Sequence, residues 1–303
     1  MNDKITPVVI ILLVIAAFLG GSLWMKYRYS SQASKAQQPE QANQPVQPSP
    51  PVFNAKKTDK PEVKFFIMSF CPYGNQAENG LKPVAELLGD KAVLEPWYIV
   101  SDAKKSCEQR CAGSVYDEAR CQQLVDAKRV PDMDTCKKYF PYNDEDTCLA
   151  ENCQALKAGE FASLHGDQEK NQDVREICVW QMGDVVKWWD FVDKVNQNCS
   201  ANDADTCWEQ QASSASLDTQ AIKSCQANQG NQLLAAHEKI VNDYSVQGSP
   251  TVYINDVLYP GGRGRTPEDY KKAICDSFTT QPSECGTVLG TGAQAAPNPG
   301  SCN

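Results

Sequence analysis

Apolar and polar positions divide the chain into regions of different character. Residues 7–25 form an apolar run without a charge, whereas residues 30–60 are rich in Gln, Pro, Ser and Ala. From residue 62 onward, short apolar runs alternate with segments of helical period. We predict a membrane anchor at 1–28, a disordered Pro/Gln-rich linker at 29–61, a folded domain at 62–286 and a loose tail at 287–303.

The apolar run at residues 7–25 is long enough to cross a bilayer. Its 19 residues would span about 28 Å as a helix, near the hydrocarbon thickness. A signal peptide has a shorter apolar region, so we expect an uncleaved signal-anchor, although cleavage stays open. The flanking charges, Lys4 before the run and Lys26 and Arg28 after it, weakly favour a cytoplasmic domain.

The start of the folded domain has the pattern of a βαβ unit. The run VKFFIMS at 63–69 predicts a buried strand, and VLEPWYIV at 93–100 predicts a second. Between them, apolar residues recur at intervals of four, three and four, which places them on one helical face: Ala77, Leu81, Val84 and Leu88. Strand, helix and strand at this spacing favour parallel strands joined by a right-handed crossover.

A cysteine-rich helical insertion is expected at about 101–240. Its first part, residues 101–159, is too polar for a core of its own, so disulfides should hold it together. A nested arrangement is one of many possible pairings of its six cysteines: Cys107–Cys153, Cys111–Cys148 and Cys121–Cys136.

The second part of the insertion, residues 172–244, is predicted to be helical. One buried stripe follows intervals of three and four: Val185, Trp188, Val192, Val195 and Cys199. Another is formed by Leu233, His237, Ile240 and Tyr244. Because His237 falls on an apolar face, we interpret it as a core histidine.

The last part of the domain predicts a hairpin and a helix. The strands TVYI and VLY flank the turn signal Asn255-Asp256. Thr266 is a suitable N-cap and Pro267 suits the first turn of a final helix that ends near residues 275–278. The predicted order is therefore β-α-β, a helical disulfide-rich insertion, then β-β-α.

Fourteen cysteines against two histidines indicate an oxidising compartment. No C-x2-C pair is present, so the sequence predicts disulfides and no metal. This outweighs the flanking charges of the apolar run, and we expect the domain on the extracytoplasmic side. The formal charge of −9 argues against nucleic acid as a partner.

Candidate chemistry lies at Cys71, in the segment SFCPYG that follows the first predicted strand. A cysteine at a helix N-terminus is a candidate nucleophile, because unpaired N–H groups and the helix dipole stabilise its thiolate. Position 74, where a second cysteine would complete a dithiol site, is Gly74. A single thiol can start an exchange but cannot resolve it alone, which favours isomerisation or resolution by another thiol.

Two other states of Cys71 stay open. It could be a structural disulfide partner or a relic. If it is free, a second cysteine must also be unpaired, and Cys302 in the tail is a candidate.

The element order, the placement of Cys71 and the Ser249-Pro250 pair before the third strand resemble the thioredoxin fold of the DsbA-like class. The resemblance implies a cis Pro250 that faces Cys71, with no cofactor. It also implies a substrate-binding surface around both sites, formed by Pro72, Tyr73, Gly74, Ser249 and Pro250.

Two families are similar in part. SFCPYG resembles the CPYC site of glutaredoxins and of gamma-interferon-inducible lysosomal thiol reductases. LHGDQEKNQDVREIC resembles the reductase signature, in which His165, Gly166, Glu169 and Cys178 match, whereas Lys170 and Asp173 depart from the pattern. With no orienting partner in sight, we interpret His165 as part of a turn before a helix.

The C-terminal half resembles the cysteine-rich luminal region of vacuolar sorting receptors over residues 162–302. The matching cysteines are Cys178, Cys199, Cys207, Cys225, Cys275, Cys285 and Cys302. Among them, Cys199–Cys207 and Cys275–Cys285 would close short loops and stabilise the fold by about 2–3 kcal/mol each. Cys178–Cys225 is a further expected pair.

These resemblances imply two different functions, since the reductases are enzymes and the receptors bind cargo. One hypothesis is a membrane-tethered protein that exchanges thiols and disulfides through Cys71, with protein substrates and a partner oxidoreductase or other resolving thiol. The other is a redox-inactive module that binds peptides or proteins. The fold alone does not decide between them.

Overall fold

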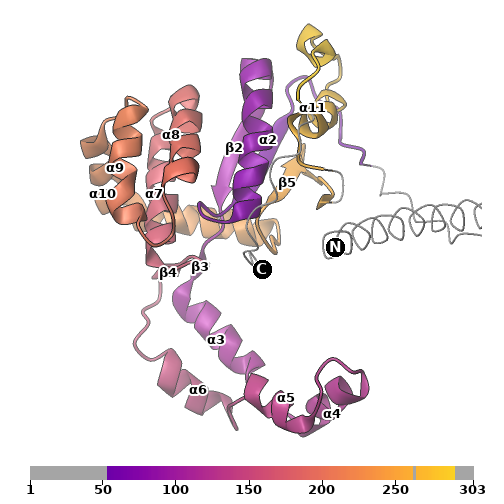
Figure 1. The fold of residues 1–303 in the computed structure, drawn as a ribbon, viewed down its shortest axis with the longest axis vertical. Coiled ribbons are helices and arrows are strands. Elements are labelled where there is room, and N and C mark those ends of the chain that lie inside the picture. The colour runs from indigo at the N-terminus through magenta and orange to yellow at the C-terminus, as the bar shows by residue number, and fades with distance from the viewer. Residues whose placement is uncertain (1–52, 262–263, 291–303) are drawn as a thin grey trace, which may run out of the picture. The chain divides into compact units, whose positions relative to one another are not determined.

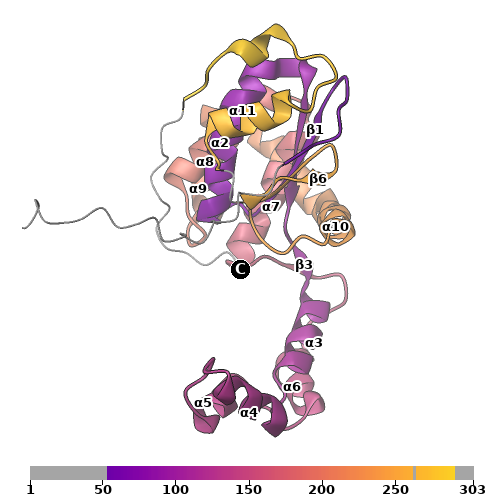
Figure 2. The ribbon, with the colours of Figure 1, turned by 90° about the vertical axis from the view of Figure 1, so that its right-hand side faces the viewer.

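The computed structural model describes residues 53–261 and 264–290, and the predicted anchor and most of the linker lie outside them. Four strands form the central sheet in the order β2-β1-β5-β6: β1 (Glu62–Ile67), β2 (Val93–Tyr98), β5 (Thr251–Ile254) and β6 (Val257–Leu258). Of these, β2 and β5 are labelled in Figure 1, and β1 and β6 in Figure 2. β1 pairs in parallel with β2 and antiparallel with β5. The element order and this topology are those of a thioredoxin-like α/β fold with a helical insertion.

Local sequence explains the ends of several elements. The β5–β6 turn uses Asn255 and Asp256, both with positive φ (49° and 59°), as the predicted hairpin requires. Helix α11 (Pro267–Cys275) begins at a capping box in which the hydroxyl of Thr266 accepts from the N–H of Asp269 and the Asp269 carboxyl accepts from the N–H of Thr266. The hairpin turn and the N-cap Thr266 were predicted from the sequence, whereas the reciprocal bond to Asp269 was not.

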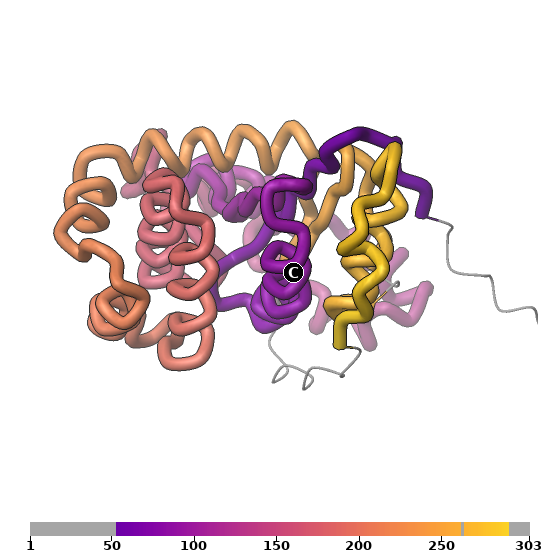
Figure 3. Tube along the Cα trace, turned by 90° about the horizontal axis from the view of Figure 1, so that it is seen from above, coloured from indigo at the N-terminus to yellow at the C-terminus, as the bar shows by residue number. Residues whose placement is uncertain are grey.

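Helices cover the sheet on both faces (Figure 3). Helices α2 (Pro72–Leu88), α8 (Val185–Asn198) and α11 lie on one face, and the 25-residue helix α10 (Thr219–Asp243) crosses the other. Alternate side chains of β1 reach opposite faces, as the period of two requires. Phe65 packs on Trp188 and Trp189 of α8, whereas Phe66 contacts Tyr244 at the end of α10.

A cysteine-rich arm, residues 103–160, leaves the body after β3 (Ser101–Asp102) and returns through β4 (Phe161–Ala162) (Figure 2). Its four helices are α3 (Ala103–Gly113), α4 (Glu118–Asp126), α5 (Met133–Tyr139) and α6 (Glu145–Asn152). The arm's buried cluster consists of four cysteines, with Tyr142, Leu149 and Leu156 packed against them. The arm is therefore held by disulfides more than by an apolar core.

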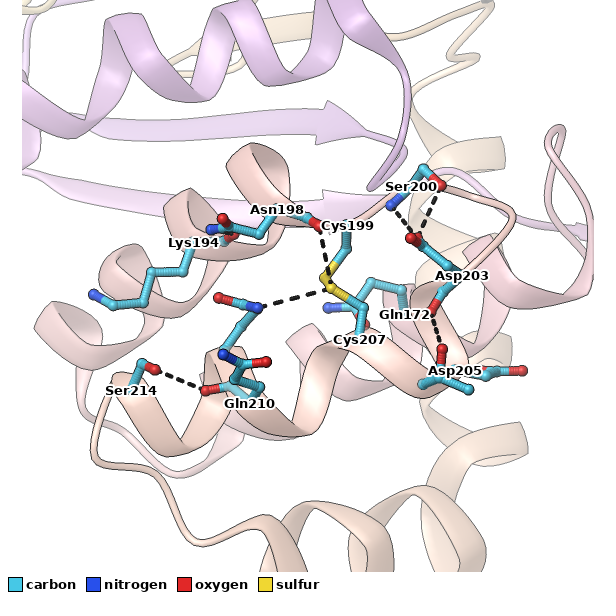
Figure 4. Close-up of a disulfide and its surroundings, with 12 residues drawn as sticks. Gln172, Lys194, Asn198, Cys199, Ser200, Asp203, Asp205, Cys207, Gln210 and Ser214 are labelled. Carbon is cyan, nitrogen blue, oxygen red and sulfur yellow. Dashed lines mark hydrogen bonds between the residues drawn. A yellow bond between two sulfur atoms is a disulfide. The ribbon is translucent and has the colours of Figure 1, made fainter.

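Six disulfides are present among the described residues. Three lie in the arm: Cys107–Cys153, Cys111–Cys148 and Cys121–Cys136. Three lie in the body: Cys178–Cys225, Cys199–Cys207 and Cys275–Cys285. These are the pairs expected from the sequence. Figure 4 shows the bridge Cys199–Cys207, which links the end of α8 to α9 (Ala204–Ser214). The Sγ atom of Cys207 also lies 3.3 Å from the carbonyl oxygen of Asn198.

The structure corrects some expectations. The predicted stripe on α10 is shifted, because Leu234 and Val241 are buried with His237, while Leu233 and Ile240 are only half-buried. The second strand ends at Tyr98, before the predicted end at Val100. The two-residue strands β3 and β4 were not foreseen. No helix among the described residues is long and apolar enough to cross a membrane, and the apolar run at 7–25 lies outside those residues.

Candidate functional site

Cys71 is the N-cap residue of α2, directly after the end of the central strand β1. Pro72 occupies the first helical position, where its missing N–H costs nothing. The open N–H groups of the first turn lie around Cys71, so a thiolate released there would be stabilised. In the structure the residue is fully buried and disulfide-bonded, and the described residues include no free cysteine.

Ser249 and Pro250 face Cys71 across the end of the sheet. The Ser249–Pro250 peptide bond is cis, as the thioredoxin resemblance implied. The Sγ atom of Cys71 lies 3.5 Å from the carbonyl oxygen of Ser249. The hydroxyl of Ser249 accepts a hydrogen bond of 3.3 Å from the backbone N–H of Met68. The structure therefore brings Cys71 and Ser249 into contact.

Gly74 is packed where a second cysteine would stand. A Cβ atom at this position would lie 2.6 Å from the hydroxyl oxygen of Ser249 and 3.3 Å from the carbonyl oxygen of Met68. Moving the Ser249 hydroxyl away would break its hydrogen bond with Met68, leaving a buried N–H without that partner. A side chain at position 74 therefore requires the Ser249 hydroxyl to move, which disfavours the usual second thiol there.

Tyr73 is the exposed residue of the CPYG segment, with 38% of its surface accessible. The guanidinium group of Arg265 lies 5.5 Å from the centre of its ring, within the range of a cation–π contact. Arg265 also donates to the side chain of Gln76 in the next turn of α2, over 3.3 Å. These contacts of Arg265 hold the side chains of Tyr73 and Gln76 in the first turns of α2, next to Cys71, while Tyr73 stays partly exposed to solvent.

Helix α7 (Asp167–Gln181) presents a row of buried carboxyl groups to the segment before Cys71. Glu169, Asp173 and Glu176 share one face at intervals of four and three, and each is fully buried. Glu169 accepts from the backbone N–H of Phe70 over 3.0 Å. Asp173 accepts from the N–H and the hydroxyl of Ser69, over 3.1 and 2.6 Å. The carboxyl groups of α7 therefore fix the two residues that precede the cysteine.

Burial raises the pKa of two carboxyl groups in this row. It raises the pKa of Asp173 well above the ordinary range, and the charges of Glu169 and Glu176 add to the effect. Burial likewise raises the pKa of Glu176 to about 7, against hydrogen bonds from Tyr98 and Gln172 that lower it. The pKa of Glu78 on α2 is raised for the same reason. Burial therefore favours the protonated forms of Asp173, Glu176 and Glu78 over their charged forms.

His165 has the orienting partner that the sequence did not reveal. Its Nδ1 lies 2.7 Å from a carboxyl oxygen of Glu169, four residues on, and its backbone N–H donates to the same side chain over 2.9 Å. The interpretation of His165 as only a turn residue was therefore incomplete, because the turn also fixes the carboxyl group that holds Phe70. The interval of four between His165 and Glu169, at the start of a predicted helix, was the available signal.

The other histidine is a packing residue, as interpreted. His237 is buried on α10, and its Nδ1 accepts from the backbone N–H of Tyr98 over 3.0 Å. Burial lowers its pKa to about 4, so it stays neutral at ordinary pH.

The arm contains a sulfur cluster away from this site. The sulfur atoms of Cys107, Cys111 and Cys153 lie within 4.8 Å of one another, a spacing compatible with metal ligands. All three belong to disulfides, however, and the closest sulfurs of the two neighbouring bridges, on Cys111 and Cys153, are 3.7 Å apart. Thiolates are the ligands that a metal would need, and bridged sulfurs do not supply them.

The family model described as the vacuolar sorting receptor thioredoxin-like domain matches residues 71–275. No curated protein sequence matches the chain. Similar solved structures include oxidised BdbD from Bacillus subtilis, with 11% identity, a TM-score of 0.41 and coverage of 73% of this chain and 89% of that one. Reduced DsbA from Mycobacterium tuberculosis has 14% identity, a TM-score of 0.42 and coverage of 82% and 94%. At these values neither likeness bears on activity.

Proposed function

The chain belongs to the vacuolar sorting receptor thioredoxin-like domain family, and we propose that it uses this fold for thiol–disulfide exchange with protein substrates through Cys71. The observation that carries the proposal is the disulfide-bonded Cys71 at the N-terminus of α2, 3.5 Å from the carbonyl oxygen of Ser249. A helix N-terminus makes the sulfur of Cys71 a good leaving group as well as a good nucleophile.

Cysteine arithmetic supports a partner for Cys71 within the chain. The six mapped bridges use twelve of the fourteen cysteines, so Cys302 is the one that remains besides Cys71. Cys302 itself lies outside the described residues. The proposal is that Cys71 and Cys302 form a redox-active pair, in which Cys302 takes the place of the second cysteine that is absent at position 74.

The exchange balances as a two-electron step. A substrate thiolate attacks Cys71, the new sulfur–sulfur bond forms, and the electron pair of the old bond leaves on the thiolate of Cys302. A second substrate thiolate then attacks the mixed disulfide and releases the Cys71 thiolate. The substrate dithiol is oxidised and the protein disulfide is reduced. In the reduced state, Cys71 can attack a wrong substrate disulfide, and a substrate thiol resolves the mixed disulfide, which is isomerisation.

Refolding of scrambled ribonuclease tests this proposal. In a glutathione buffer we expect the wild-type protein to accelerate recovery of ribonuclease activity and the variant Cys71→Ser to lower the rate to that of the buffer. The double variant Cys121→Ser with Cys136→Ser, which lacks a bridge of the arm, serves as control and should retain the wild-type rate. Equal rates for wild type and Cys71→Ser would contradict the proposal.

Placement at a membrane is a second part of the proposal. The uncharged run at 7–25 supports an anchor, the polar linker supports a tether, and six disulfides support an oxidising compartment. The folded domain would then act on the extracytoplasmic side. Protease treatment of intact cells tests this placement: loss of the domain is expected, and a protected domain would contradict it.

The alternative is a redox-inactive binding module with a structural disulfide at Cys71. The complete burial of Cys71 and the tight packing at Gly74 favour it. A module of this kind would bind substrate peptides equally well with Cys71 replaced by serine, and its Cys71 bridge would resist reduction as strongly as the other bridges.

A further inference from the structure

A groove runs from the neighbourhood of Cys71 to the first helix of the arm. It has a volume of about 610 Å³, within the range of ~300–1,000 Å³ usual for ligand pockets. Its apolar floor is formed by Met68, Ile99 and Val100. Met68 and Ile99 also pack against Cys71, and the N–H of Cys71 donates to the carbonyl oxygen of Met68 over 3.1 Å. The groove thus begins at the residues that surround the reactive sulfur.

One wall of the groove is a polar face of α3. Ala103, Ser106 and Arg110 recur at intervals of three and four, which places them on the same side of the helix, and Gln109 adjoins them. Arg110 is exposed and forms no ion pair with any residue that the structure describes. Its guanidinium group is therefore available to a ligand.

The remaining lining is mostly apolar and comes from the segment that follows α6 and returns to the body. It contains Leu156, Ala162, Ser163 and Leu164, and Leu164 is 52% exposed although it is a large apolar residue. The backbones of β3 and β4 pair with each other here, so recognition in this groove falls mainly to side chains. An apolar floor and wall with one unpaired cation suit a chain segment that carries apolar and acidic side chains.

We propose that this groove binds an extended segment of the substrate polypeptide next to its reactive cysteine, with an apolar side chain against Met68, Ile99 and Leu164 and an acidic side chain paired with Arg110. The inference rests on the proposed exchange at Cys71 and adds the class of substrate. The net charge of −9 would repel acidic segments elsewhere on the chain, so Arg110 gives this groove a local preference that the whole surface lacks.

Two single-cysteine peptides test the proposal. Both carry leucine near the cysteine, and they differ only in a glutamate or a lysine at the position meant for Arg110. The measured quantity is the rate at which each peptide forms a mixed disulfide with Cys71. We expect the glutamate peptide to react about tenfold faster than the lysine peptide, equivalent to ~1.4 kcal/mol, and we expect Arg110→Glu to reverse this order. The small thiol 2-mercaptoethanol should react equally with wild type and variant.

Matched controls separate the groove from general effects. Arg129→Glu makes the same charge change at another exposed arginine of the arm and should keep the wild-type preference. Leu164→Gln should slow both peptides, whereas Val186→Gln, at an exposed valine on α8, should slow neither. The absence of a charge preference in the wild type, or a preference unchanged by Arg110→Glu, would overturn the proposal.

Binding measured without exchange distinguishes this proposal from the one on which it rests. The same peptides with serine in place of cysteine, followed by fluorescence anisotropy, should bind with the same charge preference. If 2-mercaptoethanol does not react at Cys71 in the wild type, the proposed function fails. Tighter binding of the glutamate peptide with serine, lost in Arg110→Glu, would in that case still support the groove as a binding site. If the thiol reacts but the serine peptides show no preference, only the groove is refuted.

Discussion

Gly74 explains at the scale of one residue why the site lacks a second thiol in the helix. Its hydrogen faces the Ser249 hydroxyl, which in turn accepts from Met68. The close approach joins the start of α2 to the segment before β5. A side chain at 74 must therefore disturb the surroundings of Cys71.

The substitution Gly74→Ala should destabilise the protein by about 1–3 kcal/mol, as overpacking of a tight site does. Gly113→Ala, at a helical glycine whose added Cβ would meet nothing within 4 Å, is the control and should be neutral or slightly stabilising. Urea unfolding measures both. Adding Ser249→Ala to Gly74→Ala should recover part of the loss. A Gly74→Ala variant as stable as Gly113→Ala would show that the packing at 74 is not tight.

Glu176 should make stability depend on pH. Its pKa is raised by burial to about 7, above the value of ~4.3 for an exposed glutamate. Between these values the folded state binds more protons than the unfolded state, so the free energy of unfolding falls as the pH rises. His237 acts in the opposite sense below pH ~6.5, because its folded pKa is lowered. Comparison of variants separates the two effects.

In Glu176→Gln, which mimics the protonated carboxyl group, the decrease in unfolding free energy from pH 5 to pH 8 should be smaller than in the wild type by ~1–3 kcal/mol. Glu151→Gln, at an exposed glutamate of α6, should leave the wild-type dependence unchanged. Urea unfolding at the two pH values measures the difference. A Glu176→Gln variant with the wild-type slope would mean that this carboxyl group is ionised in the folded protein across the range.

Single residues also show how far the sequence could be interpreted. Cys71 and Pro250 could be recognised because each stands at a fixed place in a short motif. The roles of Glu169 and Asp173 could not, because their partners, Phe70 and Ser69, are about a hundred positions away along the chain. A buried carboxyl group in a polar-looking segment has no local sign of what it binds.

At the scale of elements, the arm is expected to be the part most dependent on its disulfides. Its buried cluster is made of cysteines, whereas the body has a core of large aromatic and aliphatic residues. None of the six tryptophans lies in residues 103–160, and five of them, all except Trp24 of the predicted anchor, belong to the body, so tryptophan fluorescence does not report on the arm. The two parts can therefore be followed separately.

Replacing Cys107, Cys111, Cys148 and Cys153 together by serine should unfold the arm and leave the body folded. We expect reduced helical circular dichroism, new protease cleavage within 103–160, and an unchanged tryptophan emission maximum. The control, Cys121→Ser with Cys136→Ser, should affect only α4 and α5. An arm that stays protease-resistant without its paired bridges, or a body that unfolds with it, would contradict this division.

Elements with a strong period were predictable, and those fixed by tertiary contacts were not. The βαβ unit, the final hairpin and the capped last helix each have a local signal. The strands β3 and β4 are two residues long, and each exists only because it pairs with the other, from Ser101 opposite Ala162 to Asp102 opposite Phe161. The apolar face of α10 is wider than one line of residues, since Leu233 and Ile240 are half-buried beside the buried positions. The sequence period therefore did not show which of the neighbouring lines is buried most deeply.

For the whole molecule, the central claim is that one disulfide, that of Cys71, is chemically distinct from the other six. The six mapped bridges are expected to be structural. The Cys71 bridge lies at a helix N-terminus, where the thiolate produced by reduction is stabilised, and this favours its opening.

Stepwise reduction with disulfide mapping by mass spectrometry tests this claim most directly. The folded protein is equilibrated with increasing dithiothreitol, free thiols are alkylated, and each cysteine peptide is quantified. We predict that Cys71 and Cys302 are alkylated first and together, at reductant concentrations about tenfold or more below those that open the six mapped bridges, which corresponds to ~30 mV or more in potential. If Cys71 opens together with the six mapped bridges, or after them, the account is contradicted.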